Sequence, residues 1–192
     1  MGSIWASATS SKARHWATPR RVGAVWLMLC CTWLASAHAD EVYLEPATFI
    51  AEAFDGKPPA PQKLWVAAAL NTKVRDIAGS ALPALRQKYW RAGERTVWIL
   101  EAIGRDKPIT AGYIVEHGVI VRAAILVYRE SRGAEVRHPY FTDQFKGASL
   151  RNDDRLDRDI DGITGATLSV HAISGLARVA LLLDQAARHS AQ

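Results

Sequence analysis

The sequence has little cysteine, and both cysteines, Cys30 and Cys31, lie in one apolar run near the N-terminus. It also has no charge excess beyond residue 39, where 20 Lys and Arg stand against 19 Asp and Glu. A Walker loop and a Gly-x-Gly-x-x-Gly turn are both missing. After residue 39 these absences exclude a disulfide framework and a cysteine metal site. They also argue against nucleic acid as a partner, because a basic footprint is lacking.

The first 39 residues are organised like an export signal. Four basic residues precede the 13-residue apolar run Val22–Leu34, and Ala37-His38-Ala39 forms a small-x-small cleavage site. Such a run is shorter than the roughly 20 residues that span a bilayer. The sequence therefore predicts a cleaved signal peptide at 1–39 and an exported, periplasmic chain. An uncleaved anchor is the alternative.

The pattern after residue 95 predicts an α+β domain in which helices pack on a small antiparallel sheet. Runs rich in β-branched and aromatic residues at 96–102, 109–116 and 119–128 are typical of strands. A His-Gly turn separates the last two runs and indicates a tight hairpin. After residue 167 the apolar residues recur on one helical face: Ile173, Leu176, Ala177, Ala180 and Leu183.

The remaining parts of the chain have other patterns. Helical spacing at Pro46–Phe54 and again from Leu64 to Gly79 predicts that 40–95 is an N-terminal helical arm, ahead of a domain at 96–192. Residues 131–160 are polar and mostly irregular, with one helical turn expected at "YFTDQF". Because long loops are often functional, this segment is a candidate binding surface. A solvated connection is the alternative.

The stretch "DGITGAT" places a flexible turn and two hydroxyls directly before the terminal helix. In the simpler interpretation Thr164 caps the helix and Gly165 supplies a permissive backbone. A second interpretation starts from Thr167, which falls in the first helical turn, where no further capping hydroxyl is needed. A helix N-terminus favours a phosphate, and the small residues Gly165 and Ala166 leave room for one. The spacing therefore suits a cofactor esterified through its phosphate to Thr167, with the Asp161 carboxylate upstream.

The motif "DGITGATLS" resembles the flavinylation motif of the FMN-binding domain family, Asp-x-x-Ser/Thr-Gly-Ala-Thr with Ser or Thr two residues on. The family includes the G and C subunits of the Rnf complex and of the sodium-translocating NADH:quinone reductase, together with small exported proteins. The resemblance extends over about residues 96–187, with "GVIVRAAILVYRESRG" and "FTDQFKG" in the expected order. It identifies 96–192 as an FMN-binding domain.

The resemblance also implies which residues meet the cofactor. Thr167 is the residue that would carry FMN through a phosphoester bond. The implied recognition elements are Asp161, Thr164, Gly165 and Ala166, and Gly162 and Ser169 complete the cofactor-binding positions of the motif. After the third strand, Glu130, Ser131 and Arg132 are expected to contact the flavin or its phosphate. No catalytic side chain and no metal ligand set are expected.

Other charged and aromatic residues are expected to be structural. Residues 152–159 interleave four acids with two arginines but lack the spacing of a calcium loop, so we expect a solvated loop. Trp98 is expected in the core. His171 lies four residues after Thr167 and is either a phosphate contact or an ordinary surface histidine.

The implied function is that of a periplasmic flavoprotein with one covalent FMN, an electron-transfer module rather than a stand-alone enzyme. A magnesium-dependent flavin transferase that uses FAD would attach the cofactor. The redox partner would lie in or at the cytoplasmic membrane. Two alternatives stay open: an autonomous periplasmic flavin reductase with a substrate pocket in the long loop, and a non-flavin interaction protein in which "DGITGAT" is only a helix cap.

Overall fold

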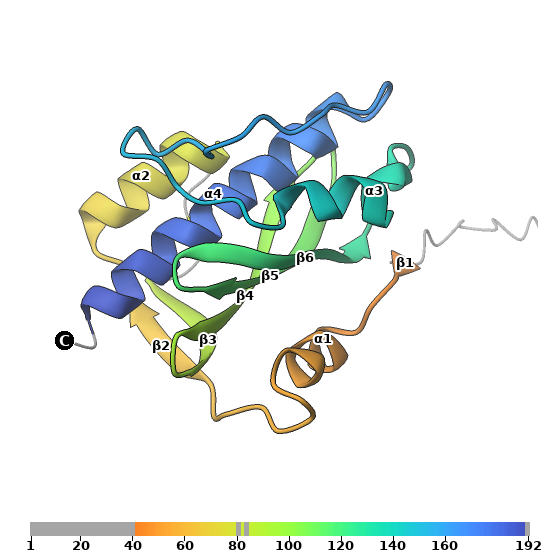
Figure 1. The fold of residues 1–192 in the computed structure, drawn as a ribbon. Helices are drawn as coiled ribbons and strands as arrows, with labels where there is room; N and C mark the ends of the chain where they lie inside the picture. The colour runs from red at the N-terminus through yellow and green to blue at the C-terminus, as the bar shows by residue number, and fades with distance from the viewer. Residues whose placement is uncertain (1–40, 80–81, 83–84, 191–192) are drawn as a thin grey trace, which may run out of the picture. The chain divides into compact units, whose positions relative to one another are not determined.

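A computed structural model describes residues 41–79, 82 and 85–190. The predicted signal peptide lies outside these described residues. The described chain forms a six-stranded antiparallel sheet in the order β1-β6-β5-β4-β3-β2, together with four α-helices (Figure 1). This architecture confirms the predicted α+β class.

The central strands lie close to the three predicted runs. The full set is β1 (Glu41–Val42), β2 (Gln62–Trp65), β3 (Arg86–Ala92), β4 (Arg95–Ile103), β5 (Pro108–Glu116) and β6 (Val119–Tyr128). A tight turn joins β5 to β6 at His117 and Gly118, with φ of 52° and 77°. Two consecutive positive φ values are what a two-residue hairpin requires, so the predicted hairpin is confirmed.

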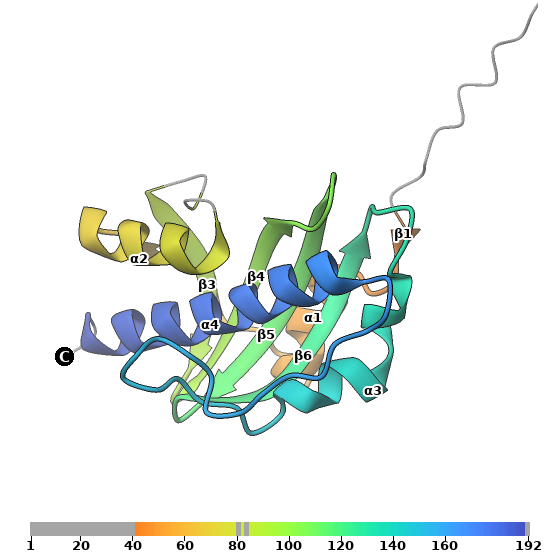
Figure 2. The same ribbon diagram turned by 90° about the horizontal axis from the view of Figure 1, so that it is seen from above.

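The helices cover both faces of the sheet. They are α1 (Pro46–Ala53), α2 (Ala68–Ala78), α3 (Pro139–Thr142) and α4 (Thr167–His189), with 3₁₀ turns at Ala134–Arg137 and Asp143–Phe145. Figure 2 shows α4 and α2 side by side on one face and α1 on the opposite face. On β4, Trp98 belongs to the cluster packed under α4, whereas Val97 belongs to the cluster packed against α1. Because successive strand residues face opposite sides, this alternation produces two apolar layers.

Helix α4 is long and apolar enough to cross a membrane by length and composition, but 67% of that segment is buried inside the domain. The five residues of its predicted apolar face are all buried. Gly175 allows α2 to approach closely, since a Cβ there would lie 3.2 Å from the carbonyl oxygen of Ile77. Packing against the sheet and α2 therefore accounts for the apolar composition of α4.

Residues 41–95 contain more than the predicted helical arm. Helices α1 and α2 lie where the sequence indicated, and α2 is followed by Gly79, with φ of 74°. In addition, β2 pairs with β3, and β3 pairs with β4 through the turn at Gly93. The proposed boundary at residue 95 falls at this β3–β4 hairpin, so the two parts share one sheet.

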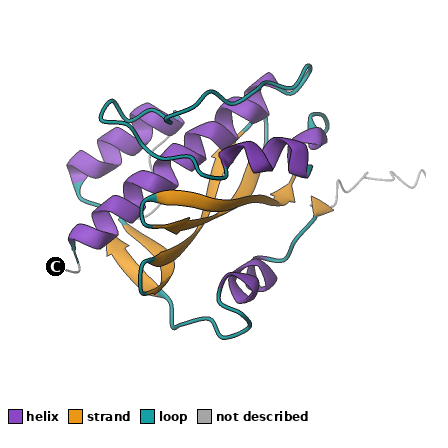
Figure 3. Cartoon of the chain, viewed as in Figure 1, coloured by secondary structure: helices purple, strands orange, loops and turns teal. Residues whose placement is uncertain are grey.

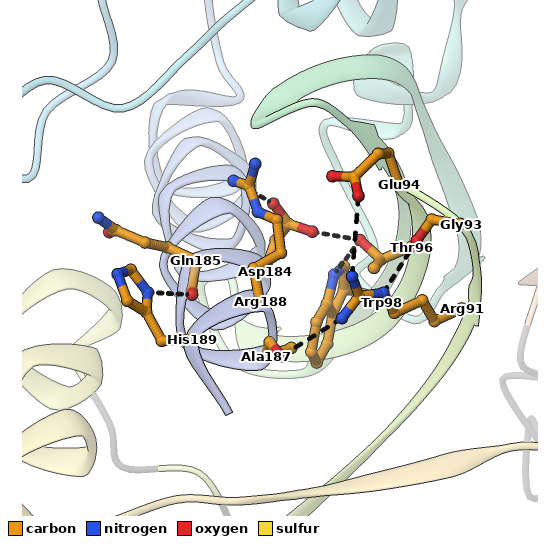
Figure 4. Close-up of polar contacts among 10 residues, drawn as sticks. All are labelled: Arg91, Gly93, Glu94, Thr96, Trp98, Asp184, Gln185, Ala187, Arg188 and His189. Carbon is orange, nitrogen blue, oxygen red and sulfur yellow. Dashed lines mark hydrogen bonds and ion pairs between the residues drawn. The ribbon is translucent and has the colours of Figure 1, made fainter. Parts of the chain in front are cut away.

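A buried polar network joins the end of α4 to β4 (Figure 4). Asp184 is fully buried, and its Oδ1 accepts a hydrogen bond of 2.7 Å from Thr96 Oγ1, which in turn accepts 3.0 Å from Trp98 Nε1. Arg188 Nη2 lies 2.7 Å from Asp184 Oδ2. Burial raises the pKa of Asp184, although Thr96 and Arg188 oppose that shift. At about 1.5 Å per helical residue, Asp184 lies far along α4 from Thr167.

Candidate functional site

Helix α4 begins at Thr167, and no side chain caps it. Its N-cap residue is Ala166, with φ of −120° and ψ of 19°. Thr164 lies in an exposed turn, and its hydroxyl forms no hydrogen bond to any described residue. The expectation that Thr164 caps the helix is therefore wrong. The first N–H groups of a helix have no acceptor within the helix, so the uncapped start of α4 presents donors beside the exposed Thr167 side chain.

The turn before α4 depends on two small residues with different roles. Gly165 has φ of 83°, a conformation that favours glycine, and a Cβ there would meet nothing within 4 Å. Ala166 is only 3% exposed because it packs against Gly133, where a Cβ would lie 3.0 Å from Ala166 Cβ. The small side chain of Ala166 therefore allows the turn to pack against the loop after β6.

Tyr128 links that loop to the first turn of α4. Its hydroxyl donates to the Arg132 carbonyl oxygen at 2.5 Å and lies 2.9 Å from Ser169 Oγ. Because a phenol carries one proton, Ser169 is the donor in the second contact. Burial raises the pKa of Tyr128, which keeps the phenol protonated for the bond to Arg132. Ser169 is itself buried, so its hydroxyl positions the turn.

Glu130 holds the loop between β4 and β5. Its Oε1 accepts hydrogen bonds from the backbone N–H groups of Arg105, Asp106 and Lys107 at 2.5, 2.8 and 3.0 Å. Partial burial opposes ionisation, but these donors outweigh it and hold the pKa of Glu130 below its usual value. Glu130 was expected to contact the flavin or its phosphate, and in the structure one of its carboxylate oxygens bonds to the protein backbone.

A cavity of about 240 Å³ opens beside Thr167 and collects most of the predicted positions. Three segments line it: the β4–β5 loop, the loop after β6 and the turn before α4. The lining residues are Arg105, Glu130, Ser131, Arg132, Gly165, Ala166, Thr167, Leu168 and Ser169. Arg105 was not predicted, because its loop meets Glu130 through a contact between residues 25 positions apart, which no local pattern reveals.

Three predicted positions do not line this cavity. Asp161, Gly162 and Thr164 lie on the chain leading to α4, and all three are exposed. The backbone N–H of Asp161 donates to Gln144 Oε1 at 2.6 Å, whereas its carboxylate forms no hydrogen bond to a described residue. The structure therefore separates the motif into buried positions that shape the turn and exposed positions that are accessible from outside.

A second cavity, of about 540 Å³, opens on the other side of Thr167. It lies between α4 and the long loop that precedes it, which Figure 3 shows running along the helix. Its charged lining residues are Arg151, Arg155, Arg158, Asp159 and Arg178, with His171 beside them. We call this cavity the arginine groove. Part of its lining belongs to residues 131–160, the candidate binding surface, but no local pattern in residues 152–159 predicts that they fold back along α4.

The match to a known family covers both sides of the site. Residues 104–182 match the model of the FMN-binding domain. This range runs from the β4–β5 loop into α4, so it includes Arg105, Glu130 and Thr167. Comparisons with curated proteins and with solved structures gave no match. Over residues 104–182 the chain is therefore similar to the FMN-binding domain family.

Proposed function

We propose that FMN is joined by a phosphoester bond to Thr167 and that the protein is a one-flavin electron-transfer module. The observation that carries the proposal is the exposed Thr167 hydroxyl at the start of an uncapped 23-residue helix. Unpaired N–H groups and the helix dipole favour a phosphate there. Ala166 offers no side-chain oxygen that would compete for these donors.

The residues around Thr167 suit a flavin that is held covalently. FMN supplies one- and two-electron redox chemistry, while the protein binds and orients it. The cavity of about 240 Å³ is smaller than the roughly 300–1,000 Å³ that encloses most small ligands. It would cover part of an FMN molecule and leave the rest accessible. A covalent bond then retains a cofactor that burial alone would hold weakly.

The same cavity supports an electron carrier over an autonomous reductase. A general base must be able to reach the proton that it abstracts. Glu130 is the carboxylate among the lining residues, and its Oε1 already accepts three backbone hydrogen bonds, which lower its pKa. The carboxylate of Glu130 thus positions the β4–β5 loop. We therefore assign the redox chemistry to the cofactor and to a partner.

Export and maturation form part of the proposal. The pattern of residues 1–39 supports export to the periplasm, where a detached flavin would be lost to the cell. The exposed positions Asp161, Gly162 and Thr164 are accessible to a separate FAD-dependent flavin transferase. We place the redox partner in or at the cytoplasmic membrane, in line with the resemblance to respiratory subunits.

The test is attachment of flavin to Thr167. The full chain is co-expressed with a flavin transferase, and fluorescence of the denatured gel band is compared with the mass of the peptide that contains Thr167. We expect a fluorescent band and a mass gain of one FMN, both lost in Thr167→Val. The matched control is Thr72→Val, which removes an exposed hydroxyl from α2.

Two outcomes contradict the proposal. One is an unmodified Thr167 peptide although the transferase modifies a known substrate in the same cells. The other is a mass gain that persists in Thr167→Val, because the attachment site would then be elsewhere.

A further inference from the structure

The arginine groove concentrates positive charge beside Thr167. Four arginines line it, with Asp159 as the one carboxylate among the lining residues. After residue 39 the chain is nearly neutral, with 20 basic and 19 acidic residues. The groove is therefore a local excess of one charge on a balanced chain. Solubility depends on the net charge of the whole chain, so it does not account for four arginines gathered in one groove.

Two of these arginines also shape the groove. Arg158 donates to the carbonyl oxygens of Lys146 and Gly147 at 3.0 and 2.7 Å. Arg178 Nε donates to the carbonyl oxygen of Asp154 at 2.6 Å and so holds the loop against α4. The terminal nitrogens of Arg178 form no hydrogen bond to a described residue.

The other two arginines have no such role. Among the described residues, the guanidinium groups of Arg151 and Arg155 pair with Asp153 alone, at 3.6 and 4.0 Å, and these side chains are 62% and 76% exposed. Ion pairs this exposed contribute little to stability. The fold therefore does not require these two side chains, and their guanidinium groups are accessible from solvent.

The neighbouring acids do not neutralise the groove fully. Asp154 pairs with Lys73 at 3.1 Å, and Asp157 accepts hydrogen bonds from Ser149 and pairs with Arg158 at 3.1 Å. Neither Lys73 nor Ser149 lines the groove. Asp154 is thus engaged outside the groove, whereas Asp157 neutralises one of the four lining arginines, Arg158.

We propose that the arginine groove docks an acidic partner protein, one that presents clustered Asp and Glu side chains to the surface around Thr167. The inference rests on the proposed function, because the partner would exchange electrons with the flavin carried by Thr167. Thr167 itself lines the groove, so a partner seated in it lies against the cofactor-bearing residue.

The chemistry of the groove favours this occupant. Guanidinium groups bind carboxylates in a bidentate manner, and charged patches speed the encounter of complementary proteins. Leu168, which follows Thr167, is 54% exposed and adds an apolar contact at the edge of the site. Electron-transfer complexes are typically small and transient, which suits a surface of this kind.

The first test uses the chain without flavin. Its binding to an octaglutamate peptide carrying a neutral dye is measured by fluorescence anisotropy over a range of salt concentrations. We expect saturable binding that weakens as salt increases, and about tenfold weaker binding in Arg151→Gln/Arg155→Gln. The control Arg75→Gln/Arg86→Gln removes the same charge from exposed positions on α2 and β3 and should bind like the unaltered chain.

Three results would overturn the inference. Equal loss in both double variants would show a response to net charge alone. Saturable binding of inorganic pyrophosphate that displaces the peptide would make the groove a small-anion site. Stronger binding to vesicles containing phosphatidylglycerol, lost in Arg151→Gln/Arg155→Gln, would make it a membrane-facing surface.

A second test uses the flavinylated chain. After reduction by dithionite, its two electrons pass to two ferricyanide anions or to two hexaammineruthenium(III) cations. We expect the ratio of the ferricyanide rate to the ruthenium rate to fall severalfold in Arg151→Gln/Arg155→Gln but not in the control. If the mass shows FMN but this ratio of rates is unchanged, the groove inference is rejected and the proposed function stands. Absence of FMN from the mass rejects the proposed function and leaves the peptide test decisive for the groove.

Discussion

The phenol oxygen of Tyr128 lies 2.9 Å from the hydroxyl oxygen of Ser169, although 41 residues separate them in sequence. Through this contact the last residue of β6 holds the first turn of α4, where Thr167 lies. The same phenol donates to the carbonyl oxygen of Arg132. One side chain therefore positions both the helix start and the loop that faces it.

Replacing Tyr128 by Phe should loosen both elements. The change keeps the ring but removes the partner of Ser169 Oγ and of the Arg132 carbonyl, at a cost of about 1–2 kcal/mol. Urea unfolding measures the loss, and amide exchange near Arg132 and Ser169 locates it. In the control Tyr89→Phe, which removes a hydroxyl bonded to Gln62 at 2.8 Å, exchange at these positions should not change. Equal exchange in the two variants would contradict the linking role.

A pair of glycine substitutions separates backbone strain from packing. Gly133 and Gly165 have the same φ of 83°, but a Cβ at Gly133 would lie 2.9 Å from Tyr128 Oη, whereas one at Gly165 meets nothing within 4 Å. We expect Gly165→Ala to cost about 1–2 kcal/mol of backbone strain and Gly133→Ala to cost more. Urea unfolding of both variants makes the comparison. Equal costs would show that contacts with Tyr128 and Ala166 do not restrict the size of the side chain at residue 133.

The β4–β5 loop should lose order in acid. The pKa of Glu130 is lowered from 4.5, so its ionised form stabilises the folded chain above that value. As the pH falls below 4.5 and through the lowered pKa, this contribution disappears. Glu130→Gln should therefore cost about 1 kcal/mol at pH 7 and little at the acidic end of this range.

Unfolding curves across this range and amide exchange at residues 105–107 measure the effect. Glu135→Gln, at an exposed residue of the 3₁₀ turn Ala134–Arg137, serves as the control. A cost for Glu130→Gln that does not depend on pH would show that the charge of Glu130 does not hold the loop.

The buried network at the far end of α4 should matter for stability but not for flavin attachment. Thr96→Val leaves Trp98 Nε1 without its acceptor and Asp184 Oδ1 without its donor, at a cost of about 3 kcal/mol. The cost is measured by urea unfolding, and the extent of flavinylation by the mass of the Thr167 peptide. A folded Thr96→Val protein that is not flavinylated would show that the two ends of α4 are coupled.

Thr167→Ala should have the opposite effect. Thr167 is exposed and does not cap α4, so the substitution should change stability by less than about 0.5 kcal/mol. Thermal unfolding of the flavin-free chain measures this. A loss near 1 kcal/mol, typical of a removed cap, would show that the Thr167 hydroxyl stabilises the start of α4.

Local patterning was sufficient for the parts of the fold that have a clear period. The runs that became β4, β5 and β6 are rich in β-branched residues, and α4 carries a complete apolar stripe, so both types of element were predicted. Strand β2 has only four residues, and β3 reads "RQKYWRA", in which polar side chains obscure the alternation. Strand β2 pairs with β3, and β3 also pairs with β4, and local pattern does not reveal these pairings.

The site divides in the same way. The order of residues in "DGITGAT" places a hydroxyl at the start of a helix, because helix periodicity and motif spacing are local properties of the chain. Chain folding alone brings Glu130 to the β4–β5 loop, Gly133 against Ala166, and Arg151 and Arg155 beside Thr167. Those contacts join segments far apart in sequence through hydrogen bonds and close packing, so tertiary structure alone decides which charges surround the attachment residue.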